Sequence, residues 1–212
     1  MKQTFFLTGI DTDAGKTYAT VFMARYFMSE GKSVITQKFV QTGCRDFSED
    51  IEVHRRLLGT GMLSEDLDHT TAPVIFTYPA SAQLAAAIDG REIDIEAIDR
   101  SRETLSSSYD VLIIEGAGGL MVPLTDDFLT IDYITSRHLP AILVTNGILG
   151  SINHTLLSLE AIMSRGIELP YVVYNTFYDS DKIIAEDTLG FIKRYLHRHL
   201  PDTRLLVMPP LV

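Results

Sequence analysis

Residues 9–17 read Gly-Ile-Asp-Thr-Asp-Ala-Gly-Lys-Thr and follow directly on the apolar run at residues 4–8. A strand that leads into a glycine-rich loop closing on Gly-Lys-Thr is typical of a phosphate-binding loop, or P-loop. The loop N–H groups point at phosphate oxygens, and the following helix adds the positive end of its dipole. In such a loop Lys16 reaches the β- and γ-phosphates, and the Thr17 hydroxyl binds Mg²⁺. Gly9 lies one residue earlier than the usual spacing, and an ordinary strand–helix turn is the alternative. We predict that the chain binds a nucleoside triphosphate.

Apolar runs alternate with segments of helical periodicity along the chain. Strands are predicted at residues 5–8, 33–38, 111–115, 141–145, 171–175 and 205–208, and helices at 16–30, 50–58, 80–88, 94–107, 151–165 and 182–199. Continuous apolar runs suit strands that are covered on both faces, as in a parallel sheet. We therefore predict one α/β domain over residues 1–212, P-loop NTPase-like, with a doubly wound, mainly parallel sheet and helices on both faces.

The composition restricts the partners of the chain. A formal net charge of −10 over 212 residues argues against nucleic-acid binding, which needs a basic stripe. No apolar run approaches the roughly 20 residues of a membrane span, and no cationic-then-apolar leader precedes the first predicted strand. The single cysteine, Cys44, rules out an intramolecular disulfide, and the six histidines show no zinc spacing. We predict a cytoplasmic protein that binds neither nucleic acid nor membranes.

Polar residues at the carboxyl ends of the predicted strands should line one crevice, because ligands of parallel sheets bind there. They form five clusters, at residues 9–17, 38–42, 115–119 and 146–153 and at Asn175. Glu115 ends an apolar run, where P-loop enzymes hold their metal, although a carboxylate in a flexible turn is the alternative. Lys38 could neutralise charge that develops between substrate and γ-phosphate, although such a lysine is more often a solvated strand end.

Three further candidates leave alternatives open. Asp50 is a plausible second metal carboxylate, or an acid that caps a helix. Gly150, Ser151, Ile152 and Asn153 open a predicted helix whose free N–H groups suit a carboxylate, unless Ser151 is simply its cap. Asn175 could hydrogen-bond a purine edge, or merely begins a turn.

Together these motifs resemble the dethiobiotin synthetase family. The matching pieces are Thr8-Gly9-x-Asp11-Thr12-x-x-Gly15-Lys16-Thr17, Lys38 with Val40 and Thr42-Gly43, Glu115-Gly116-Ala117-Gly118-Gly119, Pro123-Leu124, Leu139-Pro140 and Leu149-Gly150-x-Ile152-Asn153-His154. They occur in the family's order over most of residues 3–180. The glutamate-glycine piece and the Leu-Gly-x-Ile-Asn-His piece are much more specific than the P-loop.

The resemblance implies an ATP-dependent ligase of biotin biosynthesis. Its substrates would be 7,8-diaminopelargonic acid, CO₂ or bicarbonate and a nucleoside triphosphate, with Mg²⁺ as cofactor and dethiobiotin, ADP and phosphate as products. The resemblance implies Lys16 and Lys38 as catalytic residues and Thr17, Asp50 and Glu115 as metal ligands. For nucleotide binding it implies Thr12, Asp13, Ala14, Gly15, Lys16, Thr17, Asp50, Glu115 and Asn175. For substrate binding it implies Thr42, Gly118, Gly119, Gly150, Ser151, Ile152 and Asn153, the last four across the interface of a homodimer.

Two features depart from the family pattern. Phe39 stands where the family commonly has proline after the lysine, which changes the stiffness of the loop. The sequence ends at residues 208–212, Met-Pro-Pro-Leu-Val, whereas many relatives continue with an acidic segment that helps hold the nucleobase. We therefore expect weak discrimination between ATP and GTP.

Two other functions compete with the ligase. A regulatory switch ATPase of the plasmid-partition or division-site type shares the expected fold, but places a second lysine where this chain has Asp11. A catalytically dead nucleotide-binding module is the other, and the presence of Lys16, Thr17, Lys38 and Glu115 argues against it.

Overall fold

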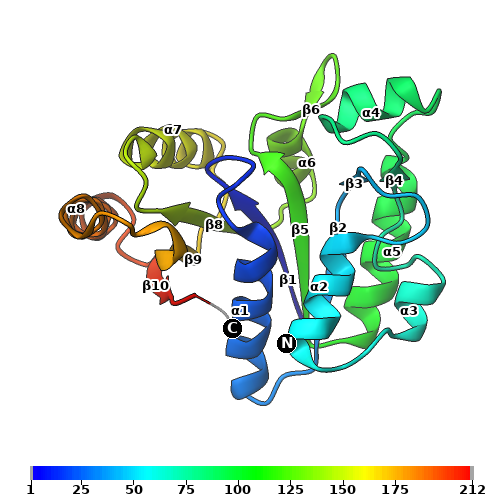
Figure 1. Cartoon of the computed structure of the whole chain (residues 1–212), viewed down its shortest axis with the longest axis horizontal. Helices are drawn as coiled ribbons and strands as arrows, with labels where there is room; N and C mark the ends of the chain where they lie inside the picture. The colour runs from blue at the N-terminus through cyan, green and yellow to red at the C-terminus, as the bar shows by residue number, and fades with distance from the viewer. Residues whose placement is uncertain (1, 211–212) are drawn as a thin grey trace.

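A six-stranded parallel sheet forms the centre of the computed structural model, which describes residues 2–210. The strands are ordered β10-β9-β8-β1-β5-β2 (Figure 1), and every neighbouring pair is parallel. Their bounds are β1 Gln3–Gly9, β2 Val34–Lys38, β5 Val111–Gly119, β8 Ala141–Asn146, β9 Tyr171–Asn175 and β10 Arg204–Met208. All six predicted strands are confirmed. β5 continues through Gly119, so Glu115 lies within a strand and not in a flexible turn.

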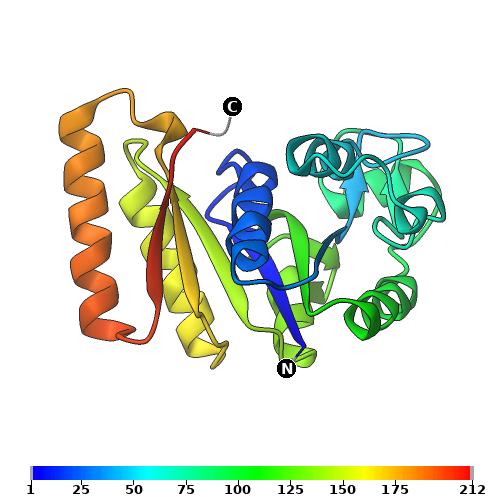
Figure 2. The same cartoon turned by 90° about the horizontal axis from the view of Figure 1, so that it is seen from below.

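Helices cover both faces of the sheet (Figures 1 and 2). On one face lie α1 (Lys16–Ser29) and α2 (Glu49–Leu58), and on the other α5 (Ile95–Ser108), α6 (Thr130–Ser136), α7 (Ser151–Ser164) and α8 (Lys182–His199). The predicted P-loop NTPase-like, doubly wound fold is therefore confirmed. No helix within residues 2–210 has the length and apolar character that crossing a bilayer would require.

Several short elements surround this sheet. They are α3 (Ser64–Leu67), α4 (Ala82–Ile88), the parallel pair β3 (Gln41–Thr42) and β4 (Ile75–Phe76), the antiparallel pair β6 (Pro123–Thr125) and β7 (Phe128–Leu129), and the 3₁₀ turn η1 (Thr176–Tyr178). Of these only α4 was predicted. β3 follows β2, β6 follows β5 and η1 follows β9, so these elements shape the segments that leave the carboxyl edge of the sheet.

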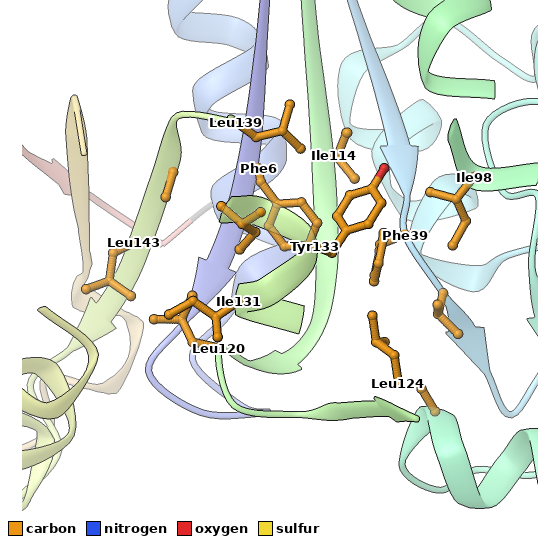
Figure 3. Close-up of a cluster of buried hydrophobic side chains, with 14 of the residues drawn as sticks. Phe6, Phe39, Ile98, Ile114, Leu120, Leu124, Ile131, Tyr133, Leu139 and Leu143 are labelled. Atoms are coloured by element: carbon orange, nitrogen blue, oxygen red, sulfur yellow. The ribbon is translucent and has the colours of Figure 1, made fainter. Parts of the chain in front are cut away.

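Two apolar layers hold the helices to the sheet. Successive residues of β1 point to opposite faces: Phe5 and Leu7 pack in the layer under α1, and Phe6 packs in the other layer. In that second layer the Phe39 ring lies 5.2 Å from Phe6 and 4.7 Å from Tyr133 (Figure 3). Phe39 is fully buried, so the segment that follows Lys38 is anchored by a core aromatic ring.

Candidate active site

The register of the sheet places Lys38 beside Glu115. These residues are paired neighbours of β2 and β5, so both side chains project from the face that carries α1 and α2. Lys38 Nζ lies 2.8 Å from Glu115 Oε1 and 3.3 Å from the carbonyl oxygen of Gly116. Lys38 is 5% exposed and Glu115 1%. The alternative of a solvated strand-end lysine is therefore wrong.

Helix α2 adds a second carboxylate to this pair. Asp50 Oδ2 lies 2.5 Å from Lys38 Nζ, and the Thr17 hydroxyl donates to Asp50 Oδ1 at 2.8 Å. Thr17 also lies 3.1 Å from Glu115 Oε1. The cap of α2 is Ser48, whose hydroxyl accepts from a backbone N–H at 3.2 Å, so the alternative of Asp50 as the capping acid is wrong. Four elements thus bring a hydroxyl, an ammonium and two carboxylates to one point.

The P-loop packs against Asn175 at the end of β9. Gly15 has φ +87°, and a Cβ atom there would lie 2.2 Å from Asn175 Nδ2, so the position needs glycine. The Asn175 amide donates to the carbonyl oxygen of Ala14 at 3.2 Å. Lys16 Nζ donates to the carbonyl oxygens of Asp11 and Thr12 at 3.0 and 2.9 Å, which folds the lysine over its own loop.

The charges of the site are strongly coupled. Burial and the neighbouring Lys38 ammonium lower the pKa of Lys16 to about 8. Burial alone would lower the pKa of Lys38 and raise that of Glu115, but the attraction between the ammonium and the carboxylates of Glu115 and Asp50 outweighs it. The pKa of Lys38 is therefore raised and that of Glu115 is held well below its ordinary range. Both groups are charged at neutral pH.

Two cavities that share a wall lie beside Gly15 of the P-loop. The larger, called the P-loop cavity below, has a volume of about 360 Å³. Its walls include Thr12, Asp13, Gly15, Lys16, Thr17, Tyr18, Lys38, Val40, Gln41, Thr42, Asp50, Glu115, Ala117, Gly118 and Tyr178. The smaller, called the aromatic cavity, has about 110 Å³ and is lined by Gly15, Tyr18, Asn175, Phe177, Tyr178, Met208 and Pro210. The two cavities share Gly15, Tyr18 and Tyr178, so they adjoin at the start of α1.

Residues 150–153 lie apart from the walls of the P-loop cavity. None of these residues lines the P-loop cavity. Gly150 is the cap position of α7, and the Ser151 hydroxyl donates to Asn146 Oδ1 at 2.5 Å, so Ser151 is not the cap. The helix start adjoins a third cavity of about 430 Å³, whose walls include Asp11, Gly119 and His154. Gly119 thus lies on this cavity, whereas Gly118 lies on the P-loop cavity.

The oxygen atoms at the meeting point suit Mg²⁺. Two carboxylates and a hydroxyl are hard ligands, and this ion is commonly held by one or two carboxylates together with phosphate oxygens and water. Within residues 2–210 no group of three or more His, Cys, Asp or Glu side chains could hold a metal ion by itself. Thr17, Asp50 and Glu115 bring such oxygen ligands together beside the P-loop.

Two further residues contact the site and were not singled out from the sequence. Thr20 Oγ1 donates to Glu115 Oε2 at 3.1 Å, and His54 Nε2 lies 2.8 Å from the same oxygen. A signal was present, because His54 follows Asp50 by four residues and Thr20 follows Thr17 by three. Such spacings place side chains on one face of a helix.

Comparisons with known proteins agree with these motifs. A family model described as an AAA domain matches residues 3–207. The chain is 45% identical to ATP-dependent dethiobiotin synthetase BioD 2 of Pasteurella multocida, over 98% of this chain and 98% of that relative. It is 47% identical to ATP-dependent dethiobiotin synthetase BioD of Chlorobaculum tepidum, over 93% of this chain and 82% of the relative.

A solved structure shows the same fold at lower identity. The septum site-determining protein MinD of Pyrococcus horikoshii, complexed with Mg-ADP, has a TM-score of 0.55 and 18% identity over 99% of this chain and 82% of that chain. Similarity at this level concerns the fold alone and does not favour a division-site ATPase. On its sequence relatives, the chain belongs to the family of ATP-dependent dethiobiotin synthetases.

Proposed function

We propose that this chain carboxylates 7,8-diaminopelargonic acid and closes the ureido ring in the P-loop cavity, with hydrolysis of ATP to ADP and phosphate. As a member of the dethiobiotin synthetase family, the chain is an ATP-dependent ligase of biotin biosynthesis. The observation that carries the assignment of the site is the meeting of Thr17, Lys38, Asp50 and Glu115 beside the P-loop.

The reaction has three steps in this proposal. One amine of the substrate takes up CO₂ as a carbamate, and a carbamate oxygen then attacks the γ-phosphorus of ATP and releases ADP. The second amine attacks the carbonyl carbon of the resulting carbamic-phosphoric anhydride and expels phosphate. Holding both amines in one site makes this last step intramolecular.

The two lysines stabilise the charge of the transferring phosphoryl group. Lys16 and Lys38 both line the P-loop cavity, so their ammonium groups can contact the γ-phosphate oxygens and the carbamate from different sides. Thr17, Asp50 and Glu115 would hold Mg²⁺, which neutralises phosphate charge when bound. Thr12, Asp13, Ala14 and Gly15 would supply the loop contacts to the phosphates.

The remaining assignments follow from the walls of the cavities. Thr42 and Gly118 line the P-loop cavity and Gly119 lies next to it, which supports their proposed contact with the diamine. The aromatic cavity would take the nucleobase. The Asn175 side chain already donates to Ala14 and accepts from Phe177 N–H at 3.1 Å, so few polar groups there distinguish one base from another.

Weak discrimination between ATP and GTP follows from this cavity. We expect the two nucleotides to support turnover with kcat/KM values within about tenfold of each other, because stacking on aromatic rings is tolerant of base identity. Steady-state rates with each nucleotide test this. A preference of several hundredfold for ATP would contradict it.

A second copy of the chain would complete the substrate site. We propose a homodimer in which residues 150–153 of one copy bind the substrate carboxylate next to the P-loop cavity of the other. Residues 150–153 lie outside the P-loop cavity of their own chain, and Leu149 beside them is 82% exposed, which supports this arrangement. A cytoplasmic location and a single domain over residues 1–212 remain predictions from the sequence.

One assay tests the proposed reaction. ADP release is measured with MgATP and bicarbonate, with and without 7,8-diaminopelargonic acid, and the product is identified by its mass. Diamine-dependent ADP release with a cyclic urea product is expected. Slow ATP turnover that the diamine does not stimulate would instead support a switch ATPase.

A further inference from the structure

A chain of hydrogen bonds between buried side chains connects α3 with Glu115. Asp66 accepts from Arg55 Nε and Nη2, each at 2.8 Å. Arg55 Nη1 donates to Thr36 Oγ1 at 2.8 Å, and the same hydroxyl lies 3.0 Å from His54 Nδ1. His54 Nε2 in turn lies 2.8 Å from Glu115 Oε2. These five residues are at most 3% exposed, so the chain is screened from water along its length.

The partners determine which nitrogen of His54 carries the proton. A guanidinium group only donates, so Thr36 Oγ1 accepts from Arg55 and still has its own proton to donate. That proton can be donated to His54 Nδ1, which lies 3.0 Å away. Nε2 then carries the ring proton and donates it to Glu115, because a bare ring nitrogen at 2.8 Å would repel the carboxylate.

The two oxygens of Glu115 consequently face different surroundings. Oε2 accepts from His54 Nε2 at 2.8 Å and from Thr20 Oγ1 at 3.1 Å, both on the interior side. Oε1 lies 3.1 Å from Thr17 Oγ1 and 2.8 Å from Lys38 Nζ, which line the P-loop cavity. The hydrogen bonds to Oε2 prevent the carboxylate from rotating and direct Oε1 at the cavity.

On the basis of the proposed metal site, we infer that His54 is a positioning residue that fixes Glu115 so that Oε1 is offered to the divalent cation. Hydrogen-bond partners behind a metal ligand are typically worth about 10-fold to 100-fold in metal affinity. A histidine that only stabilised the packing of α2 would affect the melting temperature and leave the metal affinity unchanged. Metal affinity therefore distinguishes the two roles.

Two substitutions of His54 test the contacts of its two ring nitrogens separately. His54→Gln places an amide N–H near the position of Nε2 and keeps a donor to Glu115. His54→Asn places its amide near Nδ1, which keeps a partner for Thr36 but removes the donor to Glu115. His138→Asn is the matched control, because His138 is exposed and has φ 50°, a conformation that asparagine tolerates.

Each protein is mixed with a non-hydrolysable ATP analogue and titrated with Mn²⁺, and free Mn²⁺ is followed by electron paramagnetic resonance.

We expect Mn²⁺ to bind His54→Asn about 10-fold more weakly than the wild type, and to bind His54→Gln and His138→Asn with nearly wild-type affinity. Nucleotide affinity without metal should be unchanged in all four proteins. Wild-type Mn²⁺ affinity in His54→Asn would overturn the inference, as would an equal loss in both His54 variants. Failure of the wild-type protein to bind Mn²⁺ together with the nucleotide would instead overturn the proposed metal site itself.

The wild-type protein offers a test that needs no variant to fold. Long-range ¹H–¹⁵N correlation spectra of the assigned His54 ring should show a proton on Nε2. An Nε2 without a proton would overturn the hydrogen bond to Glu115 on which the positioning role depends.

Discussion

Lys38 lies between two carboxylates, and this position makes its removal informative. Lys38→Ala is expected to lower turnover by at least about 100-fold, because the variant loses a cation that stabilises the transferring phosphoryl group. Nucleotide affinity should stay largely intact, since Lys16 and the loop amides remain. Diamine-dependent ADP release and equilibrium nucleotide binding are the two measurements, with Lys32→Ala, two residues before β2, as the control. An active Lys38→Ala enzyme would remove this residue from the mechanism.

Substitution of Gln37 is expected to change the stability of the protein. Its side chain is fully buried, and neither amide atom has a hydrogen-bond partner within the described part of the chain. Gln37 pairs in register with Ile114, so it projects into the apolar layer that contains Phe6 and Phe39. Gln37→Met should raise the free energy of unfolding by about 1 kcal/mol, because it replaces an unpaired amide with an apolar chain of similar size. Urea denaturation measures this, and a destabilised variant would contradict it.

Residues that belong to a functional motif could be predicted from the sequence, but the residues that hold those side chains in place could not. Glu115 follows an apolar run and Lys38 ends a predicted strand, so their place at the sheet edge could be read locally. The carboxylate contact of His54 depends instead on the packing of α2 against β2 and β5. No local pattern specifies how two elements that are far apart in the chain are oriented.

At the scale of elements, Phe39 ties the β2–β3 segment to the core. Phe39→Ala should lower the free energy of unfolding by about 3–5 kcal/mol, because it leaves a cavity beside Phe6 and Tyr133. Phe47→Ala is the control, since Phe47 is 38% exposed. Urea denaturation of both variants gives the comparison. Equal losses in the two variants would show that Phe39 is no more important to the core than a surface ring.

The ion pair between Arg55 and Asp66 joins α2 to α3, and its effect depends on pH. Burial alone would raise the pKa of Asp66, but the hydrogen bonds from Arg55 outweigh it and lower the pKa. Because the pKa of Asp66 is lower in the folded state than in the unfolded state, its ion pair contributes fully to stability above about pH 4. This contribution is lost as the pH falls through the pKa that Asp66 has in the folded state. Asp66→Asn should therefore cost about 3–5 kcal/mol at pH 7, because it leaves Arg55 buried without a counter-charge.

Unfolding experiments with urea at a series of pH values test the role of Asp66. The difference between wild type and Asp66→Asn should be largest at pH 7 and shrink below about pH 4. Asp127→Asn, in the exposed turn between β6 and β7, should change little at any pH. A difference that does not depend on pH would show that the substitution acts through packing and not through charge.

Long elements were predictable, and of the short ones only α4 was. Most of the six strands of the sheet contain near-continuous apolar runs, and the long helices show clear periodicity, so both stand out within a sequence window. Helix α6 has only seven residues and begins through a bond from Leu129 N–H to Asp132 at 2.9 Å. The two-residue strands β3 and β4 exist because the segments after β2 and α3 lie side by side. Such elements depend on tertiary contacts that a local pattern does not contain.

At the scale of the whole molecule, the polar residues at the carboxyl edge of the sheet line more than one cavity. The carboxyl ends of the strands lie along one edge of the sheet, as the parallel topology requires. Asp11 and residues 119–123 line a cavity beside α7, whereas none of residues 150–153 lines the P-loop cavity. The sequence places residues at an edge, but the path of the connecting segments determines which of them share a cavity.

The proposed homodimer gives the prediction that belongs to this scale. Leu149 is 82% exposed directly before α7, and Leu157, on the same helix, is 63% exposed beside the 430 Å³ cavity. We expect the wild-type protein to have the mass of two chains and Leu149→Glu to have the mass of one, because a buried carboxylate opposes association. Leu149→Glu should lose diamine-dependent turnover together with dimerisation. Its nucleotide affinity should stay within about twofold of the wild-type value, since the P-loop cavity is formed within one chain. Light scattering after size exclusion gives the mass, and Ile183→Glu on α8, also 81% exposed, is the matched control. A monomeric wild type with full activity would contradict the shared site, because the substrate carboxylate would then be held without a second copy.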